Sequence, residues 1–267
     1  MLAPCYHERM SQRDFAALES YQLIPRLLHG VEQADTGTEI LGTPCAAPLL
    51  PLFASSLGRA PQALEGLSLV AAELAPGLEP AQVVPLVRSQ KMGVLMPQVR
   101  KLRSLGVPAV ALDLTALAET PPYGRGEWRP RTKEDLAELR AAAGVPFWLY
   151  GVGSPADAEI AMEAGLEAIV VHTGAGLKLG SPATIEIFPD IFDAVAGMVA
   201  VYAGGAVRDG IDVFRYLAVG AEAVVVENDR PLAQLTAELE YAMRLTGCQT
   251  VADIGYETIF APLFGEI

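Results

Sequence analysis

Short apolar runs rich in β-branched residues alternate with amphipathic stretches along most of the chain, a rhythm typical of βα units around a parallel sheet. The apolar runs predict eight strands, over residues 46–54, 67–73, 83–88, 107–113, 145–151, 166–172, 198–203 and 221–226. The amphipathic stretches predict helices at about 90–105, 133–143, 154–164, 183–195, 208–218 and 230–245. Eight is the number of strands that closes a (β/α)8 barrel.

A local motif recurs along the chain, in which a glycine that ends a helix is followed directly by a buried strand. Its copies begin at Gly106, Gly165 and Gly220, about two βα units apart. Such a repeat favours a closed barrel over an open, doubly wound sheet. We therefore predict an α/β fold with one domain, a TIM barrel. Its expected parts are an N-terminal extension (1–45), the barrel (46–245) and a C-terminal tail (246–267).

Residues 55–66, between the first two predicted strands, are too few for a full crossover helix. A trimmed first crossover helix would leave apolar barrel surface that needs cover from another chain. We therefore expect self-association, or binding of a different protein subunit, at this flank.

A longer irregular segment, residues 114–133, follows the fourth strand on the side where barrels carry their active sites. It is either a surface connection or a lid over a ligand. Its arginines are Arg125, Arg129 and Arg131. They could collect an anionic ligand or an acidic partner, but local pairing with Glu119 and Glu127 is the preferred interpretation.

Composition supports one large core, since 51% of the 267 residues are hydrophobic and 19% are charged, which excludes disorder over most of the chain. A net charge of −13 opposes binding to nucleic acid or to an anionic membrane. Cys5, Cys45 and Cys248 form no C-x-x-C pair, which argues against a disulfide framework or a thiolate metal site and favours a cytoplasmic location. We expect neither a signal peptide nor a membrane-spanning helix.

The ends of the seventh and eighth strands are where such barrels bind phosphate, because backbone N–H groups and a helix N-terminus converge there. After the seventh strand, Gly204 and Gly205 allow the backbone to approach an anion, and Arg208 adds a positive charge. After the eighth strand only Arg230 favours an anion, since its neighbours Glu227 and Asp229 oppose one. We call Gly204, Gly205, Arg208 and Arg230 the strand 7/8 cup.

Several short motifs identify a family. They are Pro25-Arg26-Leu27-Leu28, Asp35-Thr36, Ile40-Leu41-Gly42, Leu112-Asp113, Pro182-Ala183-Thr184-Ile185, Gly205-Ala206-Val207-Arg208, Arg230-Pro231 and Met243-Arg244-Leu245-Thr246-Gly247-Cys248. In these motifs the chain resembles the FMN-dependent α-hydroxy acid oxidases and dehydrogenases, such as lactate oxidase and glycolate oxidase. The resemblance implies the barrel fold, FMN at the strand 7/8 cup and an acidic site position at Asp113.

Other positions depart from the family's pattern. Tyr150 stands where the family has a lysine beside the flavin. Residues 171–178 provide neither the family's base histidine nor its substrate-binding arginine at the matching positions. Gly204 replaces the aspartate that orients that histidine, and Asp229 replaces a glycine of the phosphate site. The family's N-terminal helix with a catalytic tyrosine is expected to be missing.

His172 and Tyr150 remain as candidate catalytic residues, each with two interpretations. His172 could be a displaced base or a hydrogen-bonded packing residue. Tyr150 could leave the flavin without the cation that the family places beside it, or it could simply fill the space at an empty barrel mouth. Lys178 could bind an anion or be solvated, and Asp113 could cap the loop that follows it.

We therefore predict a catalytically degenerate relative of this family, a scaffold or partner subunit that lacks hydroxy acid oxidation and binds FMN weakly or not at all. Its expected partners are a second copy of the chain or a different subunit, and neither nucleic acid nor a membrane. The alternative is an FMN-binding oxidoreductase of altered chemistry. A third option is a cup that holds some other phosphorylated metabolite.

Overall fold

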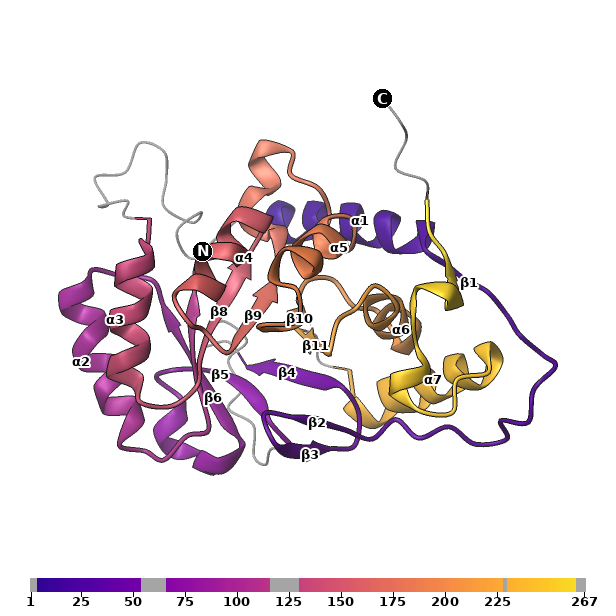
Figure 1. Ribbon diagram of the computed structural model, residues 1–267, viewed down its shortest axis with the longest axis horizontal. Helices are drawn as coiled ribbons and strands as arrows, with labels where there is room; N and C mark the ends of the chain where they lie inside the picture. Colours follow the sequence, from indigo (N-terminus) through magenta and orange to yellow (C-terminus); the bar gives the residue numbers. More distant parts are fainter. Residues whose placement is uncertain (1–3, 54–65, 116–129, 228–229, 263–267) are drawn as a thin grey trace.

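The computed structural model describes residues 4–53, 66–115, 130–227 and 230–262, with every side chain in these ranges except those of residues 4–11, 177 and 178. Eight parallel strands form a closed barrel in the order β10-β11-β4-β5-β6-β7-β8-β9 (Figure 1). They are β4 (Leu49–Phe53), β5 (Ser68–Ala71), β6 (Val83–Arg88), β7 (Val110–Asp113), β8 (Phe147–Val152), β9 (Ala168–Val171), β10 (Ala200–Ala203) and β11 (Ala223–Val226). All eight predicted strands, and the TIM barrel, are confirmed.

The barrel closes between the last strand and the first, where Val224 of β11 pairs with Leu49 of β4. Strands β9 and β11 are buried at every position, because one face meets the barrel interior and the other meets the surrounding helices. This burial explains why their sequences are continuous apolar runs rather than alternating ones.

Six helices on the outside of the barrel coincide with the six predicted ones. They are α2 (Met92–Arg103), α3 (Lys133–Ala143), α4 (Pro155–Glu163), α5 (Thr184–Val195), α6 (Gly210–Ala218) and α7 (Leu232–Thr246). Local sequence sets their ends: the Thr132 hydroxyl accepts from the backbone N–H of Asp135 in a capping box, and Gly144 ends α3 in the left-handed conformation. Two short 3₁₀ turns, η2 (Ala75–Gly77) and η3 (Pro80–Gln82), take the place of a helix between β5 and β6.

The N-terminal extension and the C-terminal tail contribute small elements of their own. The extension forms the hairpin β2 (Thr38–Ile40) and β3 (Thr43–Cys45), whose residues Ile40 and Cys45 pack against the barrel interior. Strand β1 (Gln22–Leu23) pairs antiparallel with β12 (Ile259–Phe260) of the tail. The remaining 3₁₀ turns are η5 (Thr173–Leu179), η6 (Val251–Asp253) and η7 (Tyr256–Thr258).

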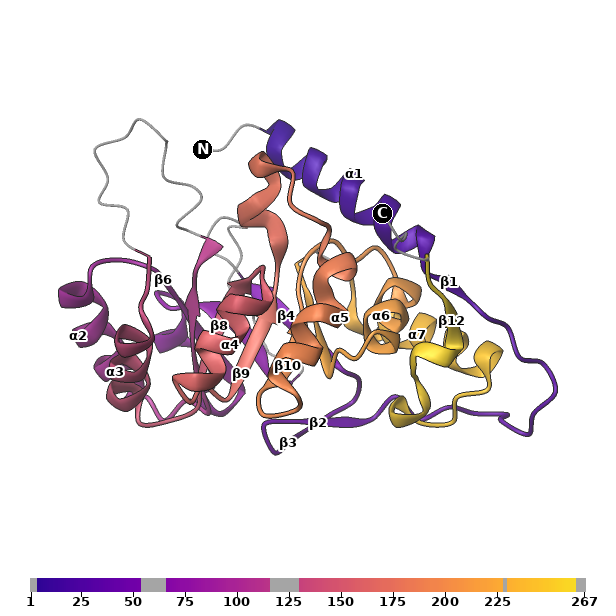
Figure 2. The same ribbon diagram turned by 45° about the horizontal axis from the view of Figure 1, so that its top comes forward.

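A helix that the sequence pattern did not predict, α1 (Pro4–Ser20), opens the described chain, so the prediction of no N-terminal helix is wrong. It lies beside α5 at the carboxyl end of the barrel in both ribbon views (Figures 1 and 2). Leu18 is fully buried, and the Tyr21 hydroxyl donates to the Ile185 carbonyl at 3.3 Å. The many polar residues of α1 give no helical pattern in the sequence, and the helix is stabilised by packing on the rest of the fold. Helix α1 packs on α5, and its Arg13 reaches the η5 turn that follows β9.

The barrel interior is filled by large side chains. Trp148 and Tyr202 face each other with ring centroids 5.1 Å apart, and both are buried together with Leu50, Leu69 and Val225. These side chains form a packed core inside the barrel.

Several sequence predictions fall outside the described residues, among them the trimmed crossover over 55–66, Asp229 and the arginines Arg125 and Arg129. Arg131 is described, and its guanidinium donates to the Ser89 hydroxyl at 3.2 Å and to the Gln90 carbonyl, groups on the neighbouring β6–α2 loop. Cys45 and Cys248 carry free thiols. Within the described part of the chain, no helix is both long and apolar enough to cross a membrane.

Candidate functional site at the carboxyl end of the barrel

Three side chains from three different strand ends meet at the barrel mouth. The hydroxyl of Tyr150, on β8, donates to Oε1 of Glu227 at 2.5 Å. The same Oε1 lies 3.5 Å from Nε2 of His172, the residue that follows β9. The rings of Tyr150 and His172 lie with their centroids 5.4 Å apart. We call Tyr150, Glu227 and His172 the mouth cluster.

The tautomer of His172 follows from its backbone contact. Its Nδ1 accepts from the backbone N–H of Gly174 at 3.2 Å, so in the neutral ring the proton lies on Nε2. That Nε2 is buried without a hydrogen bond among the described residues, and Glu227 is the carboxylate that faces it. A ring held this way has no lone pair available to accept a proton from a substrate. Of the two interpretations of His172, the geometry favours the packing residue.

Tyr150 is also a packing residue in its surroundings. It is 4% exposed and belongs to the apolar cluster inside the barrel. Burial, and then the carboxylates of Glu227 and Asp113, raise the pKa of Tyr150 well above its usual value. The phenol therefore stays protonated and fills the mouth as a neutral hydrogen-bond donor.

Asp113 ends β7 next to the mouth cluster and is tied to its own loop. Its Oδ1 accepts from the backbone N–H of Thr115 at 2.8 Å and from the Thr115 hydroxyl at 2.6 Å. Burial raises the pKa of Asp113, and these hydrogen bonds offset only part of that effect. The capping role considered for Asp113 is therefore present in the structure.

Asp113→Asn is expected to stabilise the protein at pH 7, because the amide oxygen keeps both hydrogen bonds while the partly buried charge disappears. The folded-state pKa lies above the unfolded value of 3.8, so wild-type stability falls as pH rises from 3.8 through the folded pKa. The gain should be complete above that pKa and vanish in acid. Urea denaturation at pH 7 and pH 4 measures it.

Asp253→Asn serves as a control for which the expected change in stability at pH 7 has the opposite sign. Hydrogen bonds from the Thr250 backbone and hydroxyl, and then from the Gln249 backbone, lower the pKa of the exposed Asp253 carboxyl. This variant should lose stability at pH 7 and approach the wild type in acid. A pH-independent effect of Asp113→Asn would contradict the assignment.

The strand 7/8 cup contains two glycines whose backbone or surroundings favour glycine. Gly205 has a φ of +117°, which only glycine adopts readily, and a Cβ on Gly204 would fit only tightly beside Val170 and His172. The cup glycines therefore lie where the sequence predicts them, at the end of β10.

Arg208 is held by carboxylates of its own chain. Its Nε and Nη2 donate to the two oxygens of Asp212, at 2.9 and 3.1 Å, and its Nη1 contacts Glu19 of α1. The guanidinium also lies 4.5 Å from the ring centroid of Phe15. Asp212 is fully buried and also binds Arg215 at 2.6 Å, so this network is part of the packing between α1 and α6.

Arg230 is engaged in the same way. Its Nη1 donates to the backbone carbonyl of Arg208, and its Nη2 lies 2.6 Å from Oε1 of Glu238 on α7. Both cup arginines thus carry a carboxylate partner from the chain itself. The structure brings Arg208 and Arg230 into contact, with both guanidinium groups already paired with carboxylates.

A buried polar cluster behind the cup has no counterpart among the sequence predictions. Asp14 of α1 is 2% exposed and binds Arg13, whose guanidinium also reaches the Thr173 hydroxyl and the Ser181 carbonyl. Burial raises the pKa of Asp14, with the Arg13 hydrogen bond as the main opposing effect. An Arg-Asp pair in a polar N-terminal segment gives no sequence signal, because only the folded α1 brings it to the cup.

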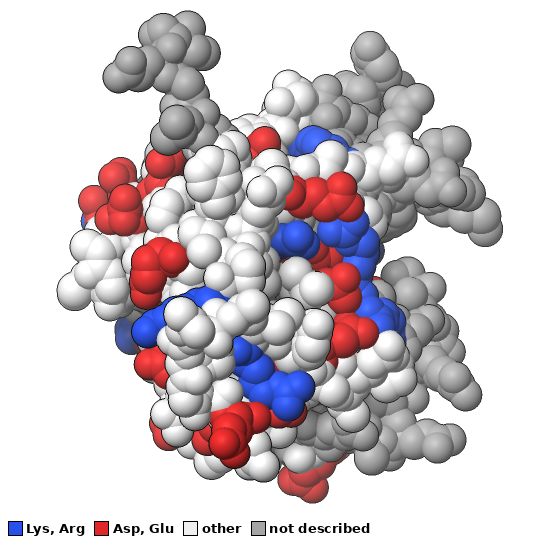
Figure 3. Space-filling view, turned by 90° about the vertical axis from the view of Figure 1, so that its right-hand side faces the viewer, with Lys and Arg blue, Asp and Glu red and all other residues white. Residues whose placement is uncertain are grey.

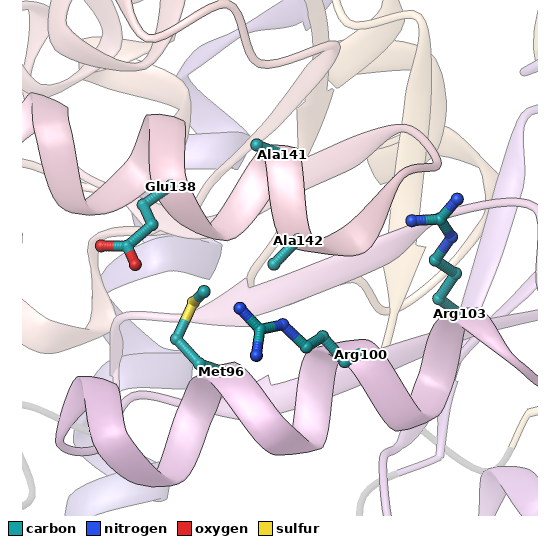
Figure 4. A pocket seen from close by; sticks show the side chains of 6 residues that line it. All are labelled: Met96, Arg100, Arg103, Glu138, Ala141 and Ala142. Carbon is teal, nitrogen blue, oxygen red and sulfur yellow. The ribbon is translucent and has the colours of Figure 1, made fainter.

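A surface hollow lies away from the mouth, between α2 and α3. It is lined by Met96, Arg100, Arg103, Glu138, Ala141 and Ala142 (Figure 4). The close-up shows the two helices side by side with Arg100 and Met96 reaching between them. No group of three or more His, Cys, Asp or Glu side chains able to hold a metal ion occurs in the described part of the chain.

Comparison with known proteins decides the family. A profile of the FMN-dependent dehydrogenases matches residues 115–261, more than half of the chain. The chain belongs to the FMN-dependent dehydrogenase family. The matched region contains the mouth cluster and the strand 7/8 cup, so the resemblance drawn from short motifs is confirmed.

Individual relatives agree with this assignment. An L-lactate oxidase of Roseobacter sp. (strain GAI101) is 42% identical over 138 residues, which cover 46% of this chain and 37% of the relative. The peroxisomal (S)-2-hydroxyacid oxidase GLO3 of Arabidopsis thaliana is 25% identical over 304 aligned positions, covering 86% of this chain and 82% of the relative. The higher identity is therefore confined to about a third of the lactate oxidase's length.

Solved structures show the same fold. A mandelate oxidase variant with an FMN adduct superposes with a TM-score of 0.76 at 23% identity, covering 97% of this chain and 92% of that one. A lactate oxidase of Pediococcus acidilactici gives a TM-score of 0.77 at 22% identity, covering 96% and 88%. Both comparisons confirm the barrel.

Proposed function

We propose that this chain is a member of the FMN-dependent dehydrogenase family that does not oxidise α-hydroxy acids and instead serves as a scaffold or partner subunit. The observation that carries the proposal is the mouth cluster. Tyr150 donates to Glu227, and His172 lies against both, so the three side chains fill the barrel mouth. A substrate would have to displace them.

The groups that α-hydroxy acid oxidation requires differ from those that the mouth cluster offers, and this difference supports the proposal. Oxidation of a small α-hydroxy acid begins with removal of a proton and needs a base within reach of the substrate, together with a cation for its carboxylate. The Nδ1 lone pair of His172 is used by Gly174, and its Nε2 carries the proton. Glu227 and Asp113 place two acidic groups at the barrel mouth, and these disfavour an anionic substrate there.

The contacts of the cup oppose FMN binding. When bound, FMN would supply hydride acceptance, and Gly204, Gly205, Arg208 and Arg230 are the residues available for its phosphate. The two arginines are bound by Asp212, Glu19 and Glu238. A phosphate near charge −2 would compete with these carboxylates for the same guanidinium groups, so we propose that FMN binds weakly or not at all.

A second candidate function is an FMN-binding oxidoreductase of altered chemistry. The observation that favours it is the backbone of the cup, since Gly205 keeps the positive φ that lets main-chain N–H groups approach an anion. In this case the cup arginines would exchange their carboxylate partners for the phosphate. Retained flavin without hydroxy acid turnover is the result that would identify this function.

The purified protein is expected to show no turnover of lactate, glycolate or mandelate, with or without added FMN. Steady-state assays with an artificial electron acceptor measure this, and the absorbance of the purified protein in the visible range reports bound flavin. Turnover that depends on the protein would contradict the main proposal. A yellow but inactive protein would favour the second candidate.

A further inference from the structure

The hollow between α2 and α3 carries charges of both signs that do not neutralise each other. Arg100 and Arg103 line it from α2, and Glu138 lines it from α3 (Figure 4). All three side chains are exposed, and none of them forms an ion pair within the described part of the chain. The hollow therefore offers a carboxylate and two guanidinium groups to a molecule from outside.

Other basic groups nearby do have acidic partners. On α3 itself, Lys133 binds Glu163 at 2.8 Å, and Arg140 binds Glu167 at 2.6 Å. Figure 3 faces the side of the molecule away from α2 and α3, and basic groups there lie among acidic ones. Opposite charges that share one hollow without pairing are a local feature of the α2–α3 groove.

The spacing of the two helices explains why these charges do not pair. The Arg103 guanidinium lies beside Gly144, where an added Cβ would be 2.7 Å from its Cζ atom. Glu138 precedes Gly144 by six residues, which corresponds to about 9 Å along the axis of α3. Arg100 lies between Glu138 and Arg103 in the close-up (Figure 4). The hollow thus has an acidic end and a basic end.

The walls between the two charged ends are apolar. Met96 lies one turn before Arg100 on α2, and Ala141 and Ala142 face it from α3. The small alanine side chains leave open a volume of about 520 Å³. Ligand sites for small molecules measure about 300–1,000 Å³, and a methionine side chain adapts readily to different apolar shapes. The hollow has room for a small molecule with an apolar body.

The helix dipole accounts for only part of this arrangement. Arg100, Lys101 and Arg103 lie at the end of α2, where positive charge is favourable. That effect needs neither a carboxylate on the facing helix nor alanines opposite the arginines. A simple anion is a poor match, because Glu138 would repel it. A molecule with an ammonium group at one end and a carboxylate at the other satisfies both ends of the hollow.

We propose that this hollow is a binding site for a short apolar peptide with both termini free. The peptide's ammonium group binds Glu138, its carboxylate binds Arg100 and Arg103, and its side chains cover Met96 and the two alanines. An extended tripeptide spans about 10 Å, which matches the distance between the charged ends. The site uses neither the mouth cluster nor the strand 7/8 cup, so it can fail without affecting the proposed function.

Titration calorimetry with the tripeptide leucyl-alanyl-leucine tests the proposal. Its N-acetyl derivative lacks the ammonium group, and its C-terminal amide lacks the carboxylate, so each derivative reports on one end of the site. Arg100→Gln removes a basic group of the hollow. Lys101→Gln is the matched control, since Lys101 is an exposed base in the same turn that does not line the hollow. Labelling the methionine methyl groups with ¹³C, with Met96→Leu for assignment, reports whether the peptide reaches Met96.

The wild type and Lys101→Gln are expected to bind the peptide with the same dissociation constant. Arg100→Gln, and each blocked derivative with the wild type, should raise that constant about 5-fold or more, and the Met96 methyl resonance should shift on binding. No binding at millimolar peptide, or equal losses for Arg100→Gln and Lys101→Gln, would overturn the proposal. So would undiminished binding of the N-acetyl derivative, which would indicate a simple anion site, or binding that leaves the Met96 resonance unchanged.

Discussion

Gly210→Ala is expected to lower the free energy of unfolding by about 3 kcal/mol, although alanine is normally the better helix former. Gly210 begins α6 and lies directly against α7. A Cβ there would be 2.2 Å from the backbone nitrogen of Leu239 and 2.4 Å from the carbonyl oxygen of Leu235. Backbone atoms cannot rotate away, so the two helices would have to separate.

The separation would also strain the hydrogen bond from the Gly210 N–H to Oε2 of Glu238, at 2.9 Å. Glu238 is the residue that holds Arg230, so the substitution reaches the strand 7/8 cup as well. Urea denaturation measures the loss. The stability lost through the disturbed packing of α6 on α7 is expected to be several times larger than the stability gained from the higher helix propensity of alanine.

Gly93→Ala is the matched control for this prediction. Gly93 occupies the first turn of α2 and is exposed, and a Cβ added there would have no neighbouring atom within 4 Å. With no clash, alanine should stabilise the protein by about 0.5–1 kcal/mol through its lower unfolded-state entropy. If both substitutions changed stability in the same direction, the close approach of α6 and α7 would not be the decisive feature.

The barrel could be predicted because its signals are local. A run such as 221–226 is short, β-branched and preceded by a glycine, and it forms β11 within two residues of the predicted bounds. The helices follow from caps and amphipathic spacing in the same way, and α3 matches its predicted range at both ends. Each element is favoured by its own sequence and by the sheet it joins.

Helix α1 could not be predicted for the opposite reason. Its sequence contains charges without a clear apolar stripe, and its stability comes from contacts with residues far along the chain, such as Ile185 and Thr173. The same holds for Asp14, which becomes a buried group only when α1 packs on the barrel. Long-range contacts of this kind leave no periodic signal in the sequence.

The candidate site was predicted in part. The order of strand ends places Tyr150, His172 and Glu227 at one end of the barrel, and that follows from the fold alone. From the sequence, Glu227 was only a charge that opposes phosphate, whereas in the structure it accepts from the Tyr150 hydroxyl. From the sequence, Arg208 is a free cation that could bind an anion. In the structure it binds the buried Asp212, and the sequence gives no sign of this contact because it exists only in the folded chain.

Tyr150→Lys combined with Glu227→Gln is expected to tighten FMN binding by about 30-fold or more relative to the wild type. The lysine restores a cation at the position where the family has one beside the flavin. Tyr150→Lys alone should give little gain, because Glu227 lies within hydrogen-bond distance of the side chain at position 150 and would neutralise the ammonium. At an effective dielectric constant of about 20, a unit charge ~4 Å away is worth about 4 kcal/mol before screening.

Solvent reduces this free energy, since the Glu227 side chain is 29% exposed. Roughly half of the 4 kcal/mol is expected to remain, which corresponds to the expected gain of about 30-fold in FMN affinity. Adding Asp229→Gly, at the residue before the cup arginine Arg230 in the sequence, restores the glycine that the family has at this position and should tighten binding further. Titration calorimetry of each protein with FMN gives the dissociation constants.

Tyr150→Phe combined with Glu227→Gln is the matched control, because it removes the same carboxylate and the same hydrogen bond without supplying a cation. If this control gained as much affinity as the lysine variant, relief of negative charge or of crowding at the mouth would explain the gain. Tight FMN binding by the unmodified chain would show that the mouth cluster and the paired arginines open for the flavin. In that event the barrel would be a flavoprotein whose own carboxylates close the site between binding events, and the second candidate function would replace the first.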